Sequence, residues 1–283
     1  MVETQIREYW RPASVEEAWA VLAERGSAAK PIGGGIDAML YPAPETTTLV
    51  DLSGAGLSYV RGEDGLAIGA ATTFTEIVES PLAGKYLGGV LIEVLEKVAS
   101  PLQRNLGTIG GTLGSAHPWS DVIPLLLALD AALSVYDGRQ RRLPLTEYLA
   151  DRARERRGLI VDVRLPTPPE TSACAFEAFG TTGFDVAVLN CACFVSFDAG
   201  RCASARIAVG GTPALAARLP AVEESLIGRP LDEDAVGRAA ALAGEAIDAR
   251  DDRRATAAYR RVLADVGVSR CLRRVAERLR GTK

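Results

Sequence analysis

Residues 105–121 read Asn105-Leu106-Gly107-Thr108-Ile109-Gly110-Gly111-Thr112-Leu113-Gly114-Ser115-Ala116-His117-Pro118-Trp119-Ser120-Asp121, and this stretch decides the fold that the sequence predicts. Glycine lets the backbone adopt positive φ and lets amide N–H groups approach a ligand without an intervening Cβ. Such a turn can wrap a pyrophosphate, while Thr108 and Thr112 donate to its oxygens and Asp121 accepts from a ribose hydroxyl. A structural loop in which Asp121 caps a helix is the alternative, but it does not explain the density of donors.

A second glycine turn, Gly33-Gly34-Gly35, follows a predicted strand at 29–32. The longer motif Gly33-Gly34-Gly35-Ile36-Asp37-Ala38 satisfies G-x-G-x-x-A, and Asp51 ends a strand 16 residues after Gly35, so a Rossmann nucleotide fold has to be considered. Pro42 and Pro44 oppose that fold, because they leave room for only one or two helical turns after the glycines. Taken alone, the segment also fits a tight structural turn.

Composition narrows the protein class. At 283 residues the chain predicts two or three subdomains, and no apolar run approaches the roughly 20 residues that cross a bilayer. The opening MVETQIREYWRP holds two acids and no apolar stretch, which argues against a signal peptide and favours a cytoplasmic protein. A net charge of −4 offers no overall attraction to nucleic acid.

The inventory of reactive side chains is short. The five cysteines form no Cys-x-x-Cys pair and predict core thiols in a reducing compartment. The single histidine, His117, makes a zinc site or a Ser-His-Asp hydrolase improbable. Redox chemistry on a borrowed cofactor fits this inventory better.

Local signals place the first glycine turn after a strand. Ser14 and Glu17 form a capping box that predicts a helix over 14–25, and strands are expected at 29–32, 48–52 and 65–70. Thr73 and Glu76 form a second box, and a helical stripe runs from 91 to 98. A short helix over 123–130 and a hairpin around Asp137-Gly138 follow the second glycine turn.

A boundary is expected at 166–169, where three prolines interrupt the chain after a charge run at 150–157 and a strand at 158–165. Beyond it, strands at 173–179, 185–197 and 204–210 predict a three-stranded antiparallel meander. Helices are expected at 213–227, 232–248 and 255–280. The fold class is therefore α+β, with a C-terminal sheet packed by helices.

The two turns together carry a family resemblance. Gly33-Gly34-Gly35-Ile36-Asp37 resembles A-G-G-T-D, and Thr108-Ile109-Gly110-Gly111 followed by Pro118 and Asp121 resembles T-I-G-G-N…S-P-x-S-D. Both mark the FAD-binding medium subunit of molybdenum hydroxylases, the family of xanthine dehydrogenase and carbon monoxide dehydrogenase. Supporting matches run in order from Tyr9-Trp10-Arg11-Pro12 through Gly210-Gly211 to Tyr259-Arg260-Arg261, and so cover nearly the whole chain.

The resemblance implies a two-lobed FAD-binding domain of the vanillyl-alcohol-oxidase (PCMH) type over 1–168, with lobes at about 1–58 and 59–168. A C-terminal flavoprotein domain would occupy 169–283. By resemblance FAD is bound without a covalent link, its pyrophosphate on the backbone at 33–37 and 108–112 and its ribose on Asp121. The implied cofactor-binding residues are Gly33, Gly34, Gly35, Ile36, Asp37, Thr108, Ile109, Gly110, Gly111, Thr112, Ser115 and Asp121.

Partners follow from the same resemblance. The family's oxidoreductases pair this subunit with a large molybdopterin subunit and a small [2Fe–2S] subunit, as a dimer of heterotrimers. The chain carries no cluster or pterin motif of its own, so its chemistry would be flavin reduction and reoxidation. A free-standing FAD oxidoreductase and a flavin-free binding or assembly protein on the same fold stay open as alternatives.

Several positions depart from the family pattern or invite other roles. Ile36 replaces the family's Thr, and Thr112 replaces its Asn. Glu177, with Thr181 and Thr182, stands where relatives often carry Lys and Arg near the flavin. The missing cation would lower the reduction potential of the flavin. His117 is expected to be structural or adjacent to FAD. Residues 259–261 are expected to anchor the C-terminal domain. A stripe on the last helix is either a solvated face or a docking surface; it comprises Arg270, Arg273, Arg274, Arg278 and Arg280.

Overall fold

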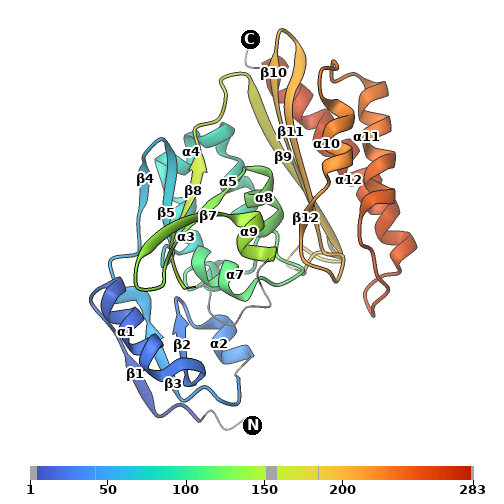
Figure 1. Cartoon of the computed structure of the whole chain (residues 1–283). Coiled ribbons are helices and arrows are strands. Elements are labelled where there is room, and N and C mark those ends of the chain that lie inside the picture. Colours follow the sequence, from blue (N-terminus) through green and yellow to red (C-terminus); the bar gives the residue numbers. More distant parts are fainter. Residues whose placement is uncertain (1–4, 42, 151–157, 184, 282–283) are drawn as a thin grey trace. The chain divides into compact units, whose positions relative to one another are not determined.

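The computed structural model describes residues 5–41, 43–150, 158–183 and 185–281 (Figure 1). Most of the charge run predicted at 150–157, and Pro42, lie outside these residues. The chain forms two compact units. The first unit contains the chain up to Leu82 with Ser100–Ser115 and Ala132–Arg164, and the second contains Ala83–Ala99, Ala116–Ala131 and the chain from Leu165 onward.

The first unit begins with a parallel three-stranded sheet in the order β1-β3-β2, covered by one helix. The helix α1 starts after Ser14, whose hydroxyl accepts from the Glu17 amide, and buries Ala18 against Val50. The helix that follows the first glycine turn spans only five residues, as the prolines predict. The bounds are β1 Glu8–Trp10, α1 Val15–Arg25, η1 Gly26–Ala28, β2 Ala29–Ile32, α2 Ile36–Leu40, β3 Thr48–Asp51 and η2 Leu52–Gly54.

The same unit holds a five-stranded sheet in the order β4-β5-β8-β6-β7. The predicted hairpin at Asp137-Gly138 joins β6 to β7, and both capping boxes that start α3 and α6 are complete, at Thr73/Glu76 and Ser100/Gln103. The strands are β4 Val60–Gly62, β5 Gly65–Gly69, β6 Ala132–Tyr136, β7 Gln140–Pro144 and β8 Leu159–Pro166. The helices are α3 Phe74–Val78, α6 Pro101–Arg104, α7 Ile109–Ser115 and α9 Leu145–Ala150.

The second unit is built on an antiparallel sheet in the order β12-β11-β10-β9, with α10, α11 and α12 on one face and α5 and α8 on the other (Figure 1). The strands are β9 Ser172–Phe179, β10 Leu189–Asp198, β11 Arg201–Gly210 and β12 Ala217–Arg218. The helices are α4 Pro81–Lys85, η3 Tyr86–Gly89, α5 Val90–Leu95, α8 Val122–Ala128, α10 Pro220–Leu226, α11 Glu233–Ala246 and α12 Ala257–Gly281.

Two expectations for this sheet were wrong. It has four strands instead of three, because the short β12 pairs with β11. The helix expected over 213–227 begins only at Pro220, because Ala217 and Arg218 pair with Val209 and Ala208 in the ladder. Pro220 then occupies the first turn of α10, where its missing N–H leaves no helical bond unmade.

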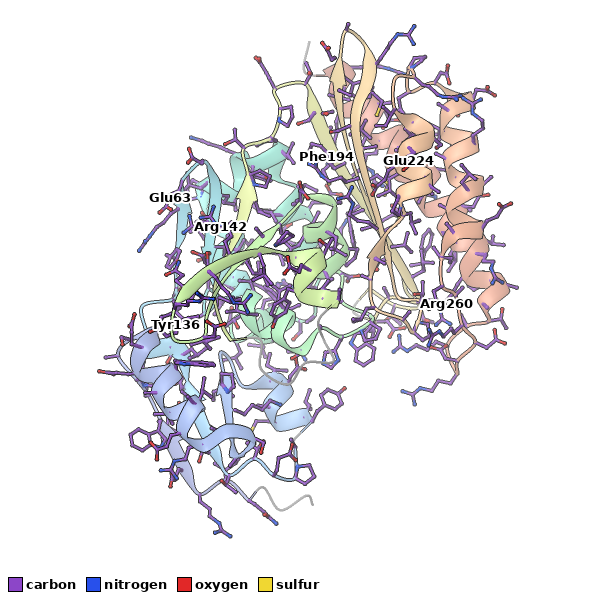
Figure 2. All side chains as sticks on the ribbon, in the orientation of Figure 1. Glu63, Tyr136, Arg142, Phe194, Glu224 and Arg260 are labelled. Carbon is purple, nitrogen blue, oxygen red and sulfur yellow. The ribbon has the colours of Figure 1, made fainter. Side chains whose placement is uncertain are left out.

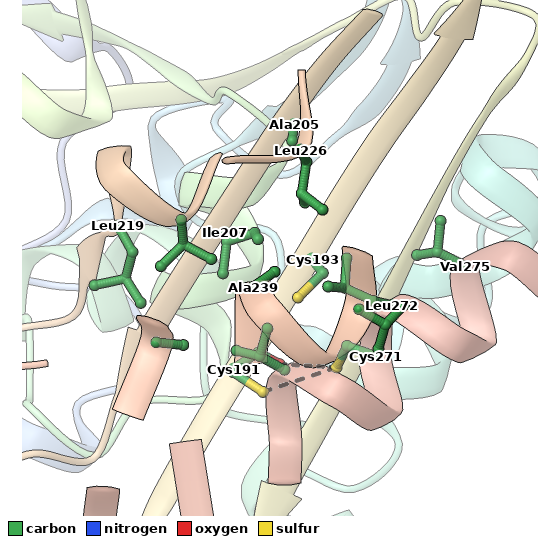
Figure 3. Packing of buried hydrophobic residues seen from close by; sticks show 14 of the residues in the cluster. Cys191, Cys193, Ala205, Ile207, Leu219, Leu226, Ala239, Cys271, Leu272 and Val275 are labelled. Atoms are coloured by element: carbon green, nitrogen blue, oxygen red, sulfur yellow. Dashed lines mark hydrogen bonds between the residues drawn. The ribbon is translucent and has the colours of Figure 1, made fainter. Parts of the chain in front are cut away.

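The core of the second unit lies between the sheet and the helices. Cys191 and Cys193 are two residues apart on β10, so both point toward α12 from the same face of the sheet. Cys191 Sγ lies 3.8 Å from Cys271 Sγ on that helix (Figure 3). Phe194, on the opposite face of β10, is also fully buried. All five cysteines are buried and free, as expected of core thiols. No helix among the described residues is both long and apolar enough to span a bilayer.

Candidate functional site

The two glycine turns meet within the first unit. A Cβ on Gly33 would lie 2.3 Å from Thr108 Oγ1, and a Cβ on Gly34 would lie 1.6 Å from the carbonyl oxygen of Leu106. Non-bonded heavy atoms do not come this close to a Cβ. The backbone at 33–34 can therefore approach the second turn only because these residues are glycine. Segments far apart in the sequence thus form one surface.

The first turn offers unused backbone donors. Among the described residues, no acceptor pairs with the amide N–H groups of Gly33, Gly34, Gly35 or Ile36. Gly35 has a φ of 72°, and no atom lies within 4 Å of the position that its Cβ would occupy. Half-buried amides without an acceptor are unusual in folded proteins, because the unmade bond destabilises the fold unless water or a ligand supplies it. Four such amides in sequence suit an anionic ligand.

The amides of the second turn are already engaged. Gly110 lies so close to Ala70 that a Cβ would come within 2.6 Å of it, which explains this glycine by packing. The hydroxyl of Thr112 donates to no described residue, and Thr108 Oγ1 accepts one bond without donating any. The engaged donors are Ile109 N–H to Thr72 O, Gly110 N–H to Ala70 O, Gly111 N–H to Thr108 Oγ1 and Thr112 N–H to Thr108 O. The segment therefore presents threonine hydroxyls on a rigid backbone.

Asp37 and Ser115 complete the predicted set in this unit. Asp37 lies in the first turn of α2, where its carbonyl accepts from the Tyr41 amide at 2.8 Å. Ser115 is the last residue of α7 and is half-buried.

Asp121 belongs to the second unit and does not cap a helix. Asp121 directly precedes α8 and has helical backbone angles. Its carboxylate accepts no hydrogen bond from the backbone amides at the start of α8. The carboxylate instead accepts from Asn190 Nδ2 at 2.7 Å. Burial raises the pKa of Asp121 to about 6, and the bond from Asn190 opposes that rise. The structural alternative considered for this acid, a helix cap, therefore does not apply.

Sequence reasoning missed Asn190, although an amide side chain in the apolar strand Leu189-Asn190-Cys191 is a visible signal. Asn190 is 0% exposed, and its Nδ2 also donates to the Ser120 carbonyl at 3.1 Å. Its Oδ1 is buried, and no residue in the described part of the chain donates to it. Both amide hydrogens of Asn190 therefore hold the segment that carries Asp121.

His117 and Trp119 form a stacked pair in this segment. Their ring centroids are 4.6 Å apart with an interplanar angle of 9°, and Trp119 is 40% exposed. The expected structural role of His117 is consistent with this stacking.

Four of the five arginines in the stripe on α12 pair with carboxylates, while Arg270 and Arg273 stay 55% and 49% exposed, as on a solvated face. Glu177 pairs with Arg270 at 2.9 Å and with Arg274 at 3.0 Å. Arg278 pairs with Glu93, and Arg273 with Glu233 at 2.8 Å. The stripe holds α12 against β9, α5 and α11, and the charge of Glu177 is compensated locally by two guanidinium groups.

The expected anchor at residues 259–261 resides in Arg260 alone. Arg260 is 1% exposed, whereas Tyr259 and Arg261 are exposed. Arg260, labelled in Figure 2, pairs through its guanidinium with both carboxylate oxygens of Asp252 at 2.9 Å. It also donates to four carbonyl oxygens, those of Val188, Gly211, Arg250 and Ala255. These bonds join α12 to the ends of β10 and β11.

Similarity to known proteins extends over nearly the whole chain. The family described as FAD binding domain in molybdopterin dehydrogenase matches residues 3–168, and the CO dehydrogenase flavoprotein C-terminal domain matches residues 174–275. The alpha subunit of the 6-hydroxypseudooxynicotine dehydrogenase complex of Paenarthrobacter nicotinovorans is 33% identical over 280 residues, which are 95% of this chain and 94% of the relative. The carbon monoxide dehydrogenase medium chain of Afipia carboxidovorans is 32% identical, covering 96% of this chain and 97% of its own.

The chain is also similar to solved structures of carbon monoxide dehydrogenases. A carbon monoxide dehydrogenase chain from Hydrogenophaga pseudoflava superimposes with a TM-score of 0.88 at 29% identity, covering 96% of this chain and 98% of that chain. Reconstituted CO dehydrogenase from Oligotropha carboxidovorans gives a TM-score of 0.89 at 27% identity, covering 98% and 100%.

Proposed function

Because the chain belongs to the family of FAD-binding domains of molybdopterin dehydrogenases, we propose that it carries electrons through FAD for a multi-subunit molybdenum hydroxylase. In this role it receives electrons from [2Fe–2S] clusters of a partner subunit and delivers them to an external acceptor. FAD supplies the redox chemistry when bound, and the chain supplies the binding site and its electrostatics.

One observation carries this proposal: the unpaired amides of residues 33–36 lie against the turn that presents the hydroxyl of Thr108. A diphosphate is the part of FAD that needs such a set of neutral donors, since each phosphate oxygen accepts hydrogen bonds strongly. Gly33, Gly34, Gly35, Ile36 and Asp37 would hold the diphosphate from one side. The other side is assigned to Thr108, Ile109, Gly110, Gly111 and Thr112, with the hydroxyls as donors and the glycines giving room.

Two further residues complete the proposed site. The carboxylate of Asp121 would accept from a ribose hydroxyl, because it accepts one hydrogen bond among the described residues and keeps further acceptor capacity. Ser115 would contribute a hydroxyl from the end of α7. The fit of these donors and acceptors to FAD is by chemical type, with neutral donors for phosphate and an acidic acceptor for ribose.

The domain division follows from the same assignment. We place the FAD-binding domain at 1–168, with lobes at about 1–58 and 59–168, and the C-terminal flavoprotein domain at 169–283. The two family matches, which end at 168 and resume at 174, support this boundary.

The partners we propose are a large molybdopterin subunit and a small [2Fe–2S] subunit, assembled in the cytoplasm as a dimer of heterotrimers. The names of the relatives support this, since they are subunits or chains of dehydrogenases and match this chain over at least 94% of their length in the two cases given above. Substrate oxidation would then occur on the molybdenum subunit.

Purification of the tagged full chain from its own organism tests the assignment. Molybdenum and iron should co-purify with the chain in fixed ratio to FAD, and substrate added to the complex should bleach the flavin absorption. A chain that purifies without either metal and turns over a small molecule by itself would favour a free-standing FAD oxidoreductase and contradict the proposal.

A further inference from the structure

We propose that Asn190, on the C-terminal sheet, is a positioning residue that fixes the carboxylate of Asp121 for the FAD ribose. This inference rests on the function proposed above, because it concerns the role given there to Asp121. It assigns part of the FAD site to a strand that lies outside the FAD-binding family match.

The direction of the hydrogen bonds carries the argument. Asn190 Nδ2 donates one hydrogen bond to Asp121 Oδ1 at 2.7 Å and the other to the Ser120 carbonyl oxygen at 3.1 Å. Both bonds therefore hold two adjacent residues of the segment before α8. A single rotatable carboxylate held through one oxygen, on a backbone held beside it, keeps one orientation and leaves the other oxygen for a ligand.

The other half of the same amide argues against a purely stabilising role. Asn190 Oδ1 is fully buried and no described residue donates to it. A buried acceptor without a donor destabilises the fold, and an aliphatic side chain in this apolar strand would avoid that loss. What the amide offers at this position, in return for its unpaired oxygen, is the pair of bonds that it donates to Ser120 and Asp121.

The surroundings of Asn190 are built to keep it in place. A Cβ on Gly210 would lie 2.5 Å from Asn190 Oδ1, so this glycine leaves the room that the amide fills. The Gly211 amide donates to the Pro118 carbonyl at 2.8 Å, which ties β11 to the segment before Asp121. Arg260 in turn donates to the carbonyls of Val188, just before β10, and of Gly211, just after β11.

Charge does not supply an alternative explanation. Arg260, which donates to the carbonyls of Val188 and Gly211, is paired with Asp252, and His117 lies in the same segment as Asp121. The pKa of Asp121 responds to burial and to the Asn190 amide, and to neither of these groups. The orientation of this carboxylate thus depends on Asn190 itself.

The test is a double-mutant cycle on the full-length apoprotein with FAD as the titrant. Asn190→Leu keeps the volume of the side chain and removes both donors, and Asp121→Asn removes the charge. We expect Asn190→Leu to weaken FAD binding about tenfold, as the loss of a charge-assisted bond would. It should also lower the thermal midpoint of unfolding, because the Asp121 carboxylate and the Ser120 carbonyl lose their donors. In the Asp121→Asn background the same substitution should change the Kd less than about twofold.

A pH profile gives a readout that a structural role would not move. FAD binding to the wild type should weaken as the pH falls through about 6, where Asp121 gains a proton, and in Asn190→Leu the midpoint should lie at higher pH. Ser196→Ala, another buried polar residue on β10, is the matched control and should leave both the Kd and the midpoint unchanged.

The outcomes separate the two claims. An equal effect of Asn190→Leu with and without Asp121→Asn, or an unchanged Kd and midpoint, overturns the positioning role. A wild-type chain that binds no FAD contradicts the proposed function instead. In that case the titration of the Asp121 carboxyl in the apoprotein, followed by carbon NMR, still decides the positioning role: Asn190→Leu should raise its pKa, and an unchanged pKa refutes it.

Discussion

Gly34 lies against the backbone of Leu106, so close that a Cβ at position 34 would come within 1.6 Å of the Leu106 carbonyl oxygen. This contact joins the two glycine turns without any side chain between them. The open amides of residues 33–36 depend on that approach, since the turn cannot keep its path with a bulkier residue.

Gly34→Ala should therefore abolish retention of FAD, because the added methyl group forces the two turns apart. We expect the Kd for FAD to rise by at least about tenfold. Gly114→Ala, in α7, is the matched control, since no atom lies within 4 Å of the position of its Cβ. Fluorescence titration of the apoproteins measures both, and a Gly34→Ala protein with wild-type affinity would show that the contact is unrelated to binding.

The hydroxyl of Thr108 should contribute to FAD binding through its unused hydrogen. Thr108→Val keeps the shape of the side chain but removes the donor, and we expect the affinity for FAD to fall about tenfold. It also removes the acceptor of the Gly111 amide, which should lower the free energy of unfolding by about 1 kcal/mol.

Thr108→Ser separates these effects from a change of shape, because it retains the hydroxyl. Its FAD affinity should stay near that of the wild type. If valine and serine at position 108 bind FAD equally well, the hydroxyl has no role in binding.

Asp121 should make the apoprotein less stable at neutral pH than at mildly acidic pH. Its folded-state pKa is raised from 3.8 to about 6, so the folded state binds a proton more readily than the unfolded state. Stability should then rise as the pH falls from above 6 toward 4, by on the order of 1–3 kcal/mol from this group. Urea unfolding at several pH values measures it.

Asp121→Asn should remove this part of the pH dependence and make the apoprotein more stable at pH 7 while weakening FAD binding. Such a trade is expected where an ionised group is kept buried for function. A variant that is less stable at pH 7 and keeps the full pH dependence would contradict the assigned burial of the charge.

Arg260 should be the most sensitive position of the second unit. Arg260→Met leaves Asp252 without its partner and removes the donors to four carbonyl groups, so we expect a loss of about 3–5 kcal/mol in the free energy of unfolding. The neighbouring Arg261→Met, at an exposed position, should change it by less than about 0.5 kcal/mol. Equal losses of stability from the substitutions at 260 and 261 would show that the buried hydrogen bonds of Arg260 do not stabilise the second unit.

Much of this fold could be predicted because local signals agreed with tertiary structure. Ser14 and Thr73 begin helices, and Asp137-Gly138 turns a hairpin, each through interactions with residues at most a few positions away. Pro44, together with the short α2, fits the exclusion of a Rossmann helix after the first glycine turn. Such signals survive folding when packing does not oppose them.

What the sequence could not predict depends on long-range contacts. The amides of residues 109 and 110 are engaged by Thr72 and Ala70, and no periodicity reveals that pairing. The arginines of α12 find Glu93 and Glu177 across the fold, and β12 forms only because β11 offers an edge. The hydrogen bond from Asn190 to Asp121 joins two residues that are distant in sequence, so no local pattern predicts it. In each case the partner is set by topology.

The binding of FAD by this chain is the central claim, and the visible spectrum of the purified full-length protein tests it most directly. After incubation with excess FAD and removal of free cofactor by desalting, we expect flavin absorption at close to one FAD per chain. The flavin should be released on denaturation in trichloroacetic acid, as expected without a covalent link. A folded protein that emerges colourless after desalting would show that this chain does not bind FAD.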